Sequence, residues 1–419
     1  MSSFPQRSLM LVSVLACSAA LPLTACAQDG STAPAAGTPA SPKAGHLIIV
    51  GGGLWPENTA VYEKILSLVP EDGRIGILPT ASGEPESSGP AYVDDFTTYG
   101  AGSRTELIEI TFTTPERASE NEYVSKIADK QVLFFTGGDQ SRITAAFRTN
   151  GQDTPGYRAV KAVLDKGGVI AGSSAGAAMM SDPMLRWGDS EEALLIGQSE
   201  APDRGVGIGQ GMGFFPYGLT GQHFLQRGRF GRLIAALEAT DKELGFGVEY
   251  KKGIHVDLAQ DRIQPLHDQA LLLIDRASAA REGLARKGLR VSLLGPNEIV
   301  NANTGDITIV PAEGRETLAA LENGMATIAP MDGAFDDYKL QEFIVMLAKY
   351  PADKITVTSD FFEFHLREDD RTQFLTSGTD ESISALNILL DIVPKEGAEA
   401  EAKRLTTETA TEAAAGEAG

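Results

Sequence analysis

The sequence predicts an α/β fold, with a mostly parallel sheet covered by helices on both faces and a small mixed unit after it. Short apolar runs alternate with amphipathic segments of helical length between residues 46 and 280. These runs are continuously apolar, which is typical of strands buried on both faces of a parallel sheet. Gly-rich, polar turns follow several of them, and α/β sheets bind ligands at such turns. We expect strands at 47–50, 74–78, 106–110, 131–135, 167–171 and 245–249, and helices at 57–69, 115–129, 141–148, 155–166 and 224–240.

The character of the chain changes after residue 285. The next stretch carries Gly, Pro and Asn turn signals between short strand-like runs, then a helical pattern, and no chemical motif. Three roles are open for it: binding polymer, forming a homodimer or packing on the core. The end of the chain is rich in Ala, Glu and Thr, which is typical of disorder. The predicted organisation is a signal peptide at 1–25, a flexible tether at 26–44, the α/β domain at 45–285, the small mixed unit at 286–394 and a disordered tail at 395–419.

Composition excludes several classes of function. Hydrophobic residues make up 42% of the chain and charged residues 22%, as in ordinary globular proteins. The formal net charge of -21 argues against a nucleic-acid partner, because phosphate binding needs clustered Lys and Arg. The two cysteines, Cys17 and Cys26, precede the folded part, which therefore has no thiolate for a metal site or a nucleophile. We expect neither a metal nor an organic cofactor.

The first 26 residues predict export. Arg7 gives a positive start, and residues 9–23 are apolar but too short and interrupted to span a membrane. Leu23-Thr24-Ala25-Cys26 resembles the lipobox of bacterial lipoproteins, in which cleavage precedes the Cys and its thiol is lipidated. This predicts an outer-membrane lipoprotein that contacts the membrane only through the lipid on Cys26. The alternative is a plain secretory signal and a periplasmic or extracellular protein.

Two glycine-rich turns follow predicted strands. Residues 51–53 are three glycines without the spacing of GxGxxG or of the Walker sequence, so we interpret them as a close approach of backbone at the sheet edge. Nucleotide binding at a helix N-terminus is the alternative. Residues 136–140 read Thr-Gly-Gly-Asp-Gln, and backbone N–H groups in such a turn can point at one spot, as an oxyanion hole requires.

The third turn supplies a candidate nucleophile. Residues 172–176 read Gly-Ser-Ser-Ala-Gly and match the GxSxG elbow, with Ser174 at its tip. The context is the one that the motif demands, because an apolar strand precedes it and helix-forming Ala-Ala-Met-Met follows. Small neighbours permit a sharp turn, and a helix N-terminus stabilises negative charge at the reacting oxygen. We therefore predict a serine hydrolase.

A serine nucleophile needs a base, and histidine is the usual one. His223 alone among the five histidines follows a turn and begins a predicted helix, so it is the candidate base. The same segment carries Arg227, Arg229 and Arg232. These side chains either form a solvated face or, beside a catalytic histidine, hold a carboxylate bidentately. The other histidines are His46, His255, His267 and His365.

Taken together, the four segments GGG, FTGGDQ, GSSAGAAMMSD and QHFLQRGRFGRL resemble those of the serine-peptidase family that contains cyanophycinase and dipeptidase E. The resemblance covers residues 45–280 and implies a fold like that of class I glutamine amidotransferases. It also implies hydrolysis of cyanophycin, a polyaspartate with arginine on each side-chain carboxyl, to β-Asp-Arg dipeptides. The expected partner is therefore cyanophycin or another peptide.

The resemblance assigns roles to individual residues. Ser174 is the expected nucleophile and His223 the expected base, and the amides around Gly138 and Ala175 form the oxyanion hole. The residues that match the substrate pocket of the family are Gln140, Gln222, Arg229 and Arg232.

Two positions depart from the family pattern. Gly221 stands where the family usually has Asp, and Tyr250 stands at the third position of the triad, with the acidic Glu249 beside it. Adjacent side chains on a strand point to opposite faces, so Glu249 can orient His223 only if the strand shifts or bends. Glu249 is the candidate acid on that condition. The open alternatives are a related peptidase acting on Asp-containing peptides and a non-catalytic lipoprotein that binds peptide or polymer.

Overall fold

The computed structural model describes residues 44–302, 307–319, 328–350, 352–378 and 382–416. The described residues belong to one compact unit. The predicted signal peptide, Cys26 and all of the tether except Ala44 lie outside them. Within the described ranges, no helix is both long and apolar enough to cross a membrane.

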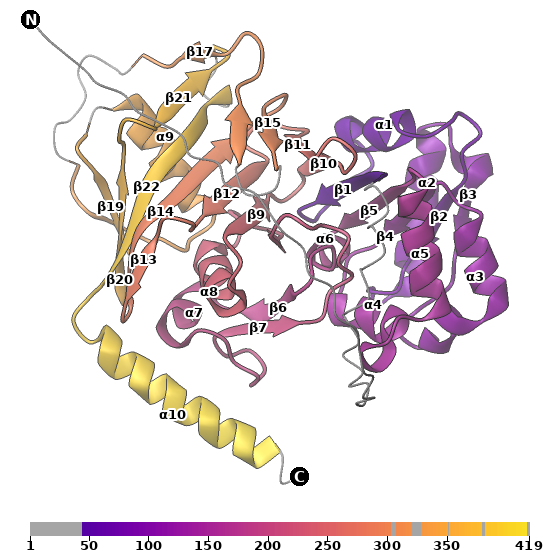
Figure 1. Ribbon diagram of the computed structural model, residues 1–419, viewed down its shortest axis with the longest axis horizontal. Coiled ribbons are helices and arrows are strands. Elements are labelled where there is room, and N and C mark those ends of the chain that lie inside the picture. Colours follow the sequence, from indigo (N-terminus) through magenta and orange to yellow (C-terminus); the bar gives the residue numbers. More distant parts are fainter. Residues whose placement is uncertain (1–43, 303–306, 320–327, 351, 379–381, 417–419) are drawn as a thin grey trace, which may run out of the picture. The chain divides into compact units, whose positions relative to one another are not determined.

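Nine strands of the described chain form the first sheet, in the order β16-β15-β11-β10-β1-β5-β4-β2-β3 (Figure 1). The five strands from β1 to β3 in this order pair in parallel, as the sequence predicts, whereas β10, β11, β15 and β16 continue the sheet in antiparallel pairs. The bounds are β1 His46–Val50, β2 Ile75–Leu78, β3 Thr105–Leu107, β4 Val132–Phe135, β5 Val169–Ser173, β10 Gly253–Asp257, β11 Arg262–Pro265, β15 Ile299–Asn301 and β16 Thr308–Val310.

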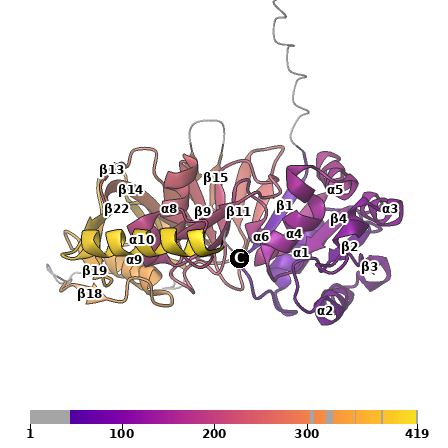
Figure 2. The same ribbon diagram turned by 90° about the horizontal axis from the view of Figure 1, so that it is seen from below.

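Helices cover both faces of the parallel part, as Figure 2 shows. Successive residues of β1 enter two different cores: Leu47 and Ile49 pack with α3, α4 and α5, whereas Ile48 and Val50 pack with α1 and α2. This two-sided burial explains the continuously apolar strands. The helices are α1 Thr59–Ser67, α2 Pro85–Thr98, α3 Asn121–Ala128, α4 Gln140–Phe147 and α5 Pro155–Asp165, with 3-10 turns at Gly102–Arg104, Pro115–Ser119 and Thr149–Gly151.

A second, mostly antiparallel sheet joins the middle of the chain to its end. Its main path is β18-β19-β20-β22-β14-β12-β9-β8, with β13, β17 and β21 beside it. Helices α7, α8 and α9 share a hydrophobic core with this sheet. The strands are β8 Leu219–Gly221, β9 Leu244–Val248, β12 Leu271–Asp275, β13 Ala280–Glu282, β14 Ala285–Leu294, β17 Glu316–Thr317, β18 Met331–Asp332, β19 Ile355–Thr358, β20 Phe362–Arg367, β21 Gln373–Thr376 and β22 Ser384–Pro394. The helices are α7 Ser190–Ile196, α8 Phe230–Thr240 and α9 Lys339–Lys349, and a separate ribbon of β6 Met184–Gly188 and β7 Val206–Gly209 lies nearby.

The predicted boundary at residue 285 is wrong. Strand β14 pairs with β12 on one edge and with β22 on the other, so residues 286–394 continue a sheet that begins before the boundary. The unit packs on the core, which is one of the three roles that the sequence left open. The strand predicted at 245–249 is β9, and it lies in this second sheet rather than in the parallel one.

The predicted disorder at 395–419 is also wrong for most of the segment. Helix α10 spans Ala398–Gly416 and buries Ala398, Ala402 and Leu405 against the second core (Figure 2). Glu412 of α10 accepts hydrogen bonds from Arg204 in the loop after α7. The Ala- and Glu-rich composition is that of a good helix former, and three small or apolar residues on one face suffice to dock it.

Candidate active site

The turns singled out in the sequence meet at the carboxyl ends of their strands. The N–H of Ser174, after β5, donates to the carbonyl of Val50 at 3.0 Å. The N–H of His223, after β8, donates to the carbonyl of Gly51 at 2.6 Å. Turns that are far apart in the sequence therefore share one locus, as expected for an α/β sheet.

Ser174 lies on a strained turn between β5 and the short helix α6 (Ala175–Ala178). Its backbone has φ 55° and ψ -105°, a conformation that non-glycine residues rarely adopt. The glycines of the motif permit this turn. A Cβ on Gly172 would lie 2.3 Å from the carbonyl oxygen of Gly176, and a Cβ on Gly176 would lie 2.4 Å from that of Phe135. The structure thus supplies the geometry that the GxSxG pattern predicts.

The hydroxyl of Ser174 meets the imidazole of His223. Their Oγ and Nε2 atoms are 3.0 Å apart, within hydrogen-bonding distance. His223 is 8% exposed, and its other ring nitrogen, Nδ1, lies 2.9 Å from Oε1 of Gln226. Burial is the main cause that lowers the pKa of His223, to about 4, and the positive charges of Arg227, Arg229 and Arg232 lower it further. The imidazole is therefore neutral, as a base must be, over most of the pH range.

The three glycines after β1 make room for this imidazole. A Cβ on Gly52 would lie 2.2 Å from Nε2 of His223, and a Cβ on Gly53 would lie 2.0 Å from the ring of Tyr250. Tyr250 stacks on the imidazole of His223 with ring centroids 5.3 Å apart and an interplanar angle of 24°. The glycines therefore serve close packing against His223 and Tyr250, which agrees with the interpretation of the triplet as a close backbone approach.

The structure does not bring Glu249 into contact with the imidazole. Its carboxylate accepts instead from the backbone N–H groups of Leu225 at 2.5 Å, Gln226 at 3.3 Å and Tyr250 at 2.6 Å. Glu249 is 1% exposed, and burial raises the pKa of its carboxyl while these three N–H groups oppose the rise. The expectation that Glu249 contacts His223 is thus wrong: the carboxylate binds the backbone of the turn that carries His223.

That turn also corrects a predicted helix. The sequence predicts a helix from residue 224, whereas α8 begins at Phe230. The amides of Leu225 and Gln226 bond to Glu249, and Gly228 adopts φ +52° where a Cβ would lie 2.1 Å from the carbonyl oxygen of Phe335. The sequence motifs do not single out Gln226. Its spacing of three residues after His223 is the signal that could have found it.

The family resemblance assigns the oxyanion hole to the backbone N–H groups of Gly138 and Ala175, in the two turns around Ser174. Within the described residues, the N–H groups of Gly138 and Ala175 have no hydrogen-bond acceptor. A Cβ on Gly137 would lie 3.3 Å from Cβ of Ser174, which places this turn directly against the serine. Gly138 has φ +138°, and a Cβ there would lie 2.0 Å from the carbonyl oxygen of Ala81. The oxyanion hole that the family resemblance implies at these two amides stays a prediction.

All four predicted substrate-binding side chains form hydrogen bonds within the protein. Gln140 is 6% exposed and donates to the carbonyls of Leu185 and Arg186, each at 2.8 Å, so its amide group holds β6. Gln222 accepts from Arg229 at 2.7 Å through Oε1. Arg232 is buried behind them. Its Nη1 donates to the carbonyl of Gly188 at 3.3 Å, and its Nε has no hydrogen-bond partner.

Arg227 and Arg229 line a pocket of ≈ 360 Å³. Within the described residues, neither they nor Arg232 form an ion pair with a carboxylate. Burial, followed by the charges of Arg232 and Arg227, lowers the pKa of Arg229, whereas the charge of Glu249 raises it. The remaining lining residues are Gly188, Asp189, Ser190 and Asp203.

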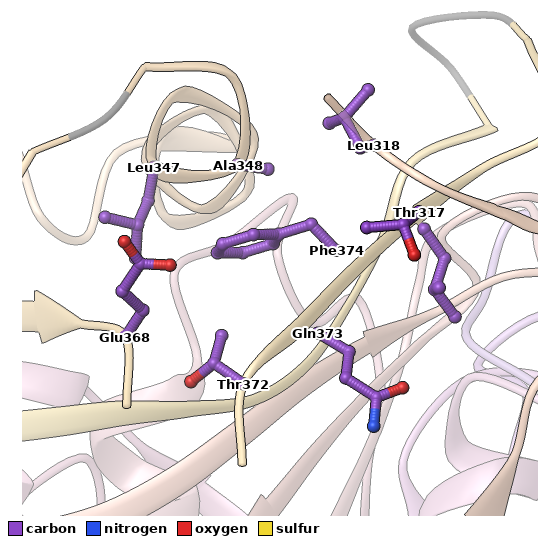
Figure 3. Close-up of a pocket in the computed structure, with 9 residues that line it drawn as sticks. Thr317, Leu318, Leu347, Ala348, Glu368, Thr372, Gln373 and Phe374 are labelled. Atoms are coloured by element: carbon purple, nitrogen blue, oxygen red, sulfur yellow. The ribbon is translucent and has the colours of Figure 1, made fainter. Parts of the chain in front are cut away.

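A second pocket of ≈ 340 Å³ lies in the C-terminal sheet, between α9 and β21 (Figure 3). Figure 3 shows Phe374 and Leu347 in its lining, with the carboxylate of Glu368 at its edge. It contains no pair of nucleophile and base. Among the described residues, moreover, no group of three or more His, Cys, Asp and Glu side chains is placed to hold a metal ion.

A serine and a histidine in this geometry serve acyl transfer, and together with the α/β fold they define the class of serine-type hydrolases. Comparison with known proteins narrows the class. Residues 47–202 match the model of peptidase family S51. The chain is 30% identical over 243 residues to a cyanophycinase of Geminocystis herdmanii, an alignment that covers 56% of this chain and 84% of that protein. The chain belongs to peptidase family S51 and is a serine-type peptidase.

Other relatives are matched over a smaller share of their length. A cyanophycinase of Synechococcus elongatus is 32% identical over 180 residues, and the alignment covers 42% of this chain and 51% of the relative. This chain thus spans about half the length of that protein. Among solved structures, a peptidase from an acI-B1 Actinobacterium is 16% identical, with a TM-score of 0.41 over 65% of this chain and 96% of its own.

Proposed function

We propose that this chain hydrolyses cyanophycin to β-Asp-Arg dipeptides, with Ser174 as nucleophile and His223 as base. The observation that carries the proposal is the group of arginines without carboxylate partners beside the Ser–His pair. Arginine binds carboxylates bidentately, and a buried guanidinium without a counterion favours an anionic ligand. Every dipeptide unit at the end of cyanophycin carries such carboxylates.

The pocket that Arg227 and Arg229 line also contains carboxylates, which suit the arginine side chain of the dipeptide. Asp189 and Asp203 line it together with Arg227 and Arg229. Asp189 uses Oδ1 to cap α7, which leaves Oδ2 without a donor in the described chain. A guanidinium of the substrate can bind these carboxylates, while its carboxylate binds the arginines. A zwitterionic dipeptide therefore matches both signs of charge in the pocket.

The proposed reaction is acyl transfer in two steps. His223 takes the proton of Ser174 through Nε2 as Oγ attacks the scissile carbonyl, and the N–H groups of Gly138 and Ala175 hold the developing oxyanion. His223 then gives this proton to the leaving amine, which leaves an acyl ester on Ser174. Water activated by His223 hydrolyses the ester and regenerates the serine.

Incubating the purified protein with cyanophycin and, separately, with α-Asp dipeptides tests the substrate. We expect β-Asp-Arg from cyanophycin and no cleavage of the α-linked dipeptides, with products identified by mass spectrometry. Cleavage of the α-Asp dipeptides alone would favour the second candidate, an Asp-directed peptidase. One observation favours that candidate: Gly221 stands where the family usually has Asp, so the site lacks one polar residue of the family pattern. Binding of cyanophycin without any hydrolysis would instead indicate a non-catalytic binding lipoprotein.

We further propose export and lipid attachment at Cys26, on the basis of the Leu23-Thr24-Ala25-Cys26 segment. The wild-type protein should fractionate with outer membranes and incorporate labelled palmitate. Cys26→Ser should lose the label and release the protein from the membrane fraction. Wild-type protein that is processed after an alanine and carries no label would support the plain secretory signal.

A further inference from the structure

The partner of the imidazole Nδ1 is an amide rather than a carboxylate. Nδ1 of His223 lies 2.9 Å from Oε1 of Gln226. Because an amide oxygen only accepts hydrogen bonds, Nδ1 carries the proton and Nε2 presents its lone pair to Oγ of Ser174, 3.0 Å away. Gln226 thus holds the base in the tautomer that can accept the serine proton.

Glu249 cannot replace Gln226 in this role without rearrangement of the turn. Its two carboxylate oxygens bind the backbone N–H groups of Leu225, Gln226 and Tyr250. These bonds fix the segment on which both His223 and Gln226 lie. Glu249 is therefore a positioning residue that acts through the backbone, one step removed from the imidazole.

Tyr250 and Gly52 fix the plane of the imidazole. The ring of Tyr250 stacks on that of His223, with ring centroids 5.3 Å apart. Gly52 lies against the imidazole, so close that a Cβ on Gly52 would collide with Nε2. The imidazole lies between Tyr250 and Gly52. Its polar contacts in the described chain are the two hydrogen bonds to Ser174 and Gln226. The orientation that a buried carboxylate provides in Ser–His–acid sites is provided here by packing and one amide.

An amide orients the base without supplying charge. A carboxylate stabilises the imidazolium that forms during catalysis, whereas an amide contributes only its dipole. The positive charges of Arg227, Arg229 and Arg232 all act on His223, and all three disfavour the imidazolium. A substrate carboxylate bound to these arginines would relieve that repulsion at the moment when the proton moves.

We propose that Gln226 is the third member of the site, a positioning residue that fixes the tautomer and orientation of His223 in place of an acid. This inference rests on the proposed roles of Ser174 and His223, and it does not depend on which peptide is the substrate. It gives the chain a Ser174–His223–Gln226 site, with Glu249 holding the turn beneath.

Replacing Gln226 tests the proposal. Gln226→Ala should lower the rate of Ser174 labelling by a fluorophosphonate about 10²-fold, the lower end of the range for general-base catalysis. Gln226→Glu should keep or raise the wild-type rate at pH 7 and move the acid limb of the pH profile upward by at least one pH unit. The matched control is Gln373→Glu at an exposed position of strand β21, which should change neither.

The outcomes distinguish a failure of the proposed role of Gln226 from a failure of the proposed nucleophile, Ser174. If Ser174 is labelled but Gln226→Glu leaves the acid limb in place, Gln226 has only a structural role and this inference is wrong. If Ser174 is not labelled at all, the proposed nucleophile is wrong. NMR titration of His223, assigned with a His223→Gln variant, then still tests Gln226. Its midpoint should lie near pH 4 in the wild type and higher in Gln226→Glu; an unmoved midpoint would overturn the proposal.

Discussion

Gly52 has no side chain, and His223 occupies the place where one would be. The φ of Gly52, +115°, favours glycine, and a Cβ on Gly52 would lie 2.2 Å from Nε2 of His223. Gly52→Ala should therefore displace the imidazole from Ser174 and lower kcat/KM by about 10²-fold or more, as expected when general-base catalysis is lost. Steady-state hydrolysis of the best substrate measures this.

Gly100→Ala is the matched control for Gly52→Ala. Gly100 has φ +78°, and nothing lies within 4 Å of the added Cβ. Both variants pay the strain of a left-handed conformation, about 1 kcal/mol. Only the variant at Gly52 should lose activity. Equal activity in the two variants would mean that the position of His223 tolerates the added methyl group.

Ser174 is predictable from the sequence because the GxSxG motif follows a buried strand of the parallel sheet. The strand before His223, β8, lies in the second sheet and is not among the predicted strands. The sequence misassigns the third residue for a physical reason. Whether Glu249 faces the imidazole depends on how the chain turns after β9, and that turn is fixed by its contacts with Leu225 and Gln226, far away in the sequence. Side-chain direction at a strand end is a tertiary property.

Helix α10 shows the limit of composition as a guide to order. Its residues predict disorder, yet one face buries Ala398, Ala402 and Leu405 in the second core. Conversely, the strands of the parallel sheet are predicted because burial on both faces leaves a continuous apolar signal. The division at residue 285 was predicted from a change of local pattern, whereas β14 pairs with strands on both sides of that point. Strand pairing over long distances leaves no local signature.

Leu405→Ala tests whether α10 is a docked helix. Leu405 is 6% exposed, and loss of a buried leucine side chain destabilises proteins by about 2–5 kcal/mol. We expect the free energy of unfolding in urea to fall by about 2 kcal/mol, the low end of that range, since the helix packs on one face only. Lys403→Ala, on the exposed face of the same helix, should change it by less than about 0.5 kcal/mol. Identical stabilities of the two variants would favour an undocked tail.

Several histidines of this protein are buried in their neutral form. Burial lowers the pKa of His255 to about 3 and of His223 to about 4, and it also lowers the pKa values of His46 and His267. The unfolded chain binds these protons near pH 6.5, before the folded chain does. The stability that they contribute is therefore present above pH 6.5 and is lost as the pH falls through the folded pKa values.

The free energy of unfolding should accordingly fall between pH 7 and pH 4.5. One pKa unit corresponds to about 1.4 kcal/mol, so His223 alone contributes about 3 kcal/mol over its full titration. Urea unfolding at a series of pH values measures the fall, and His255→Gln should make it shallower. A free energy that does not change over this range would contradict the buried neutral histidines.

At the scale of the whole molecule, we propose that this member of peptidase family S51 cuts peptide bonds through Ser174. Hydrolysis of cyanophycin by the wild type and by Ser174→Ala, with binding of the polymer measured in parallel, tests that claim most directly. We expect the wild type to release β-Asp-Arg, and we expect the variant to lose hydrolysis while it still binds the polymer. Release of β-Asp-Arg by Ser174→Ala at the wild-type rate would contradict the claim.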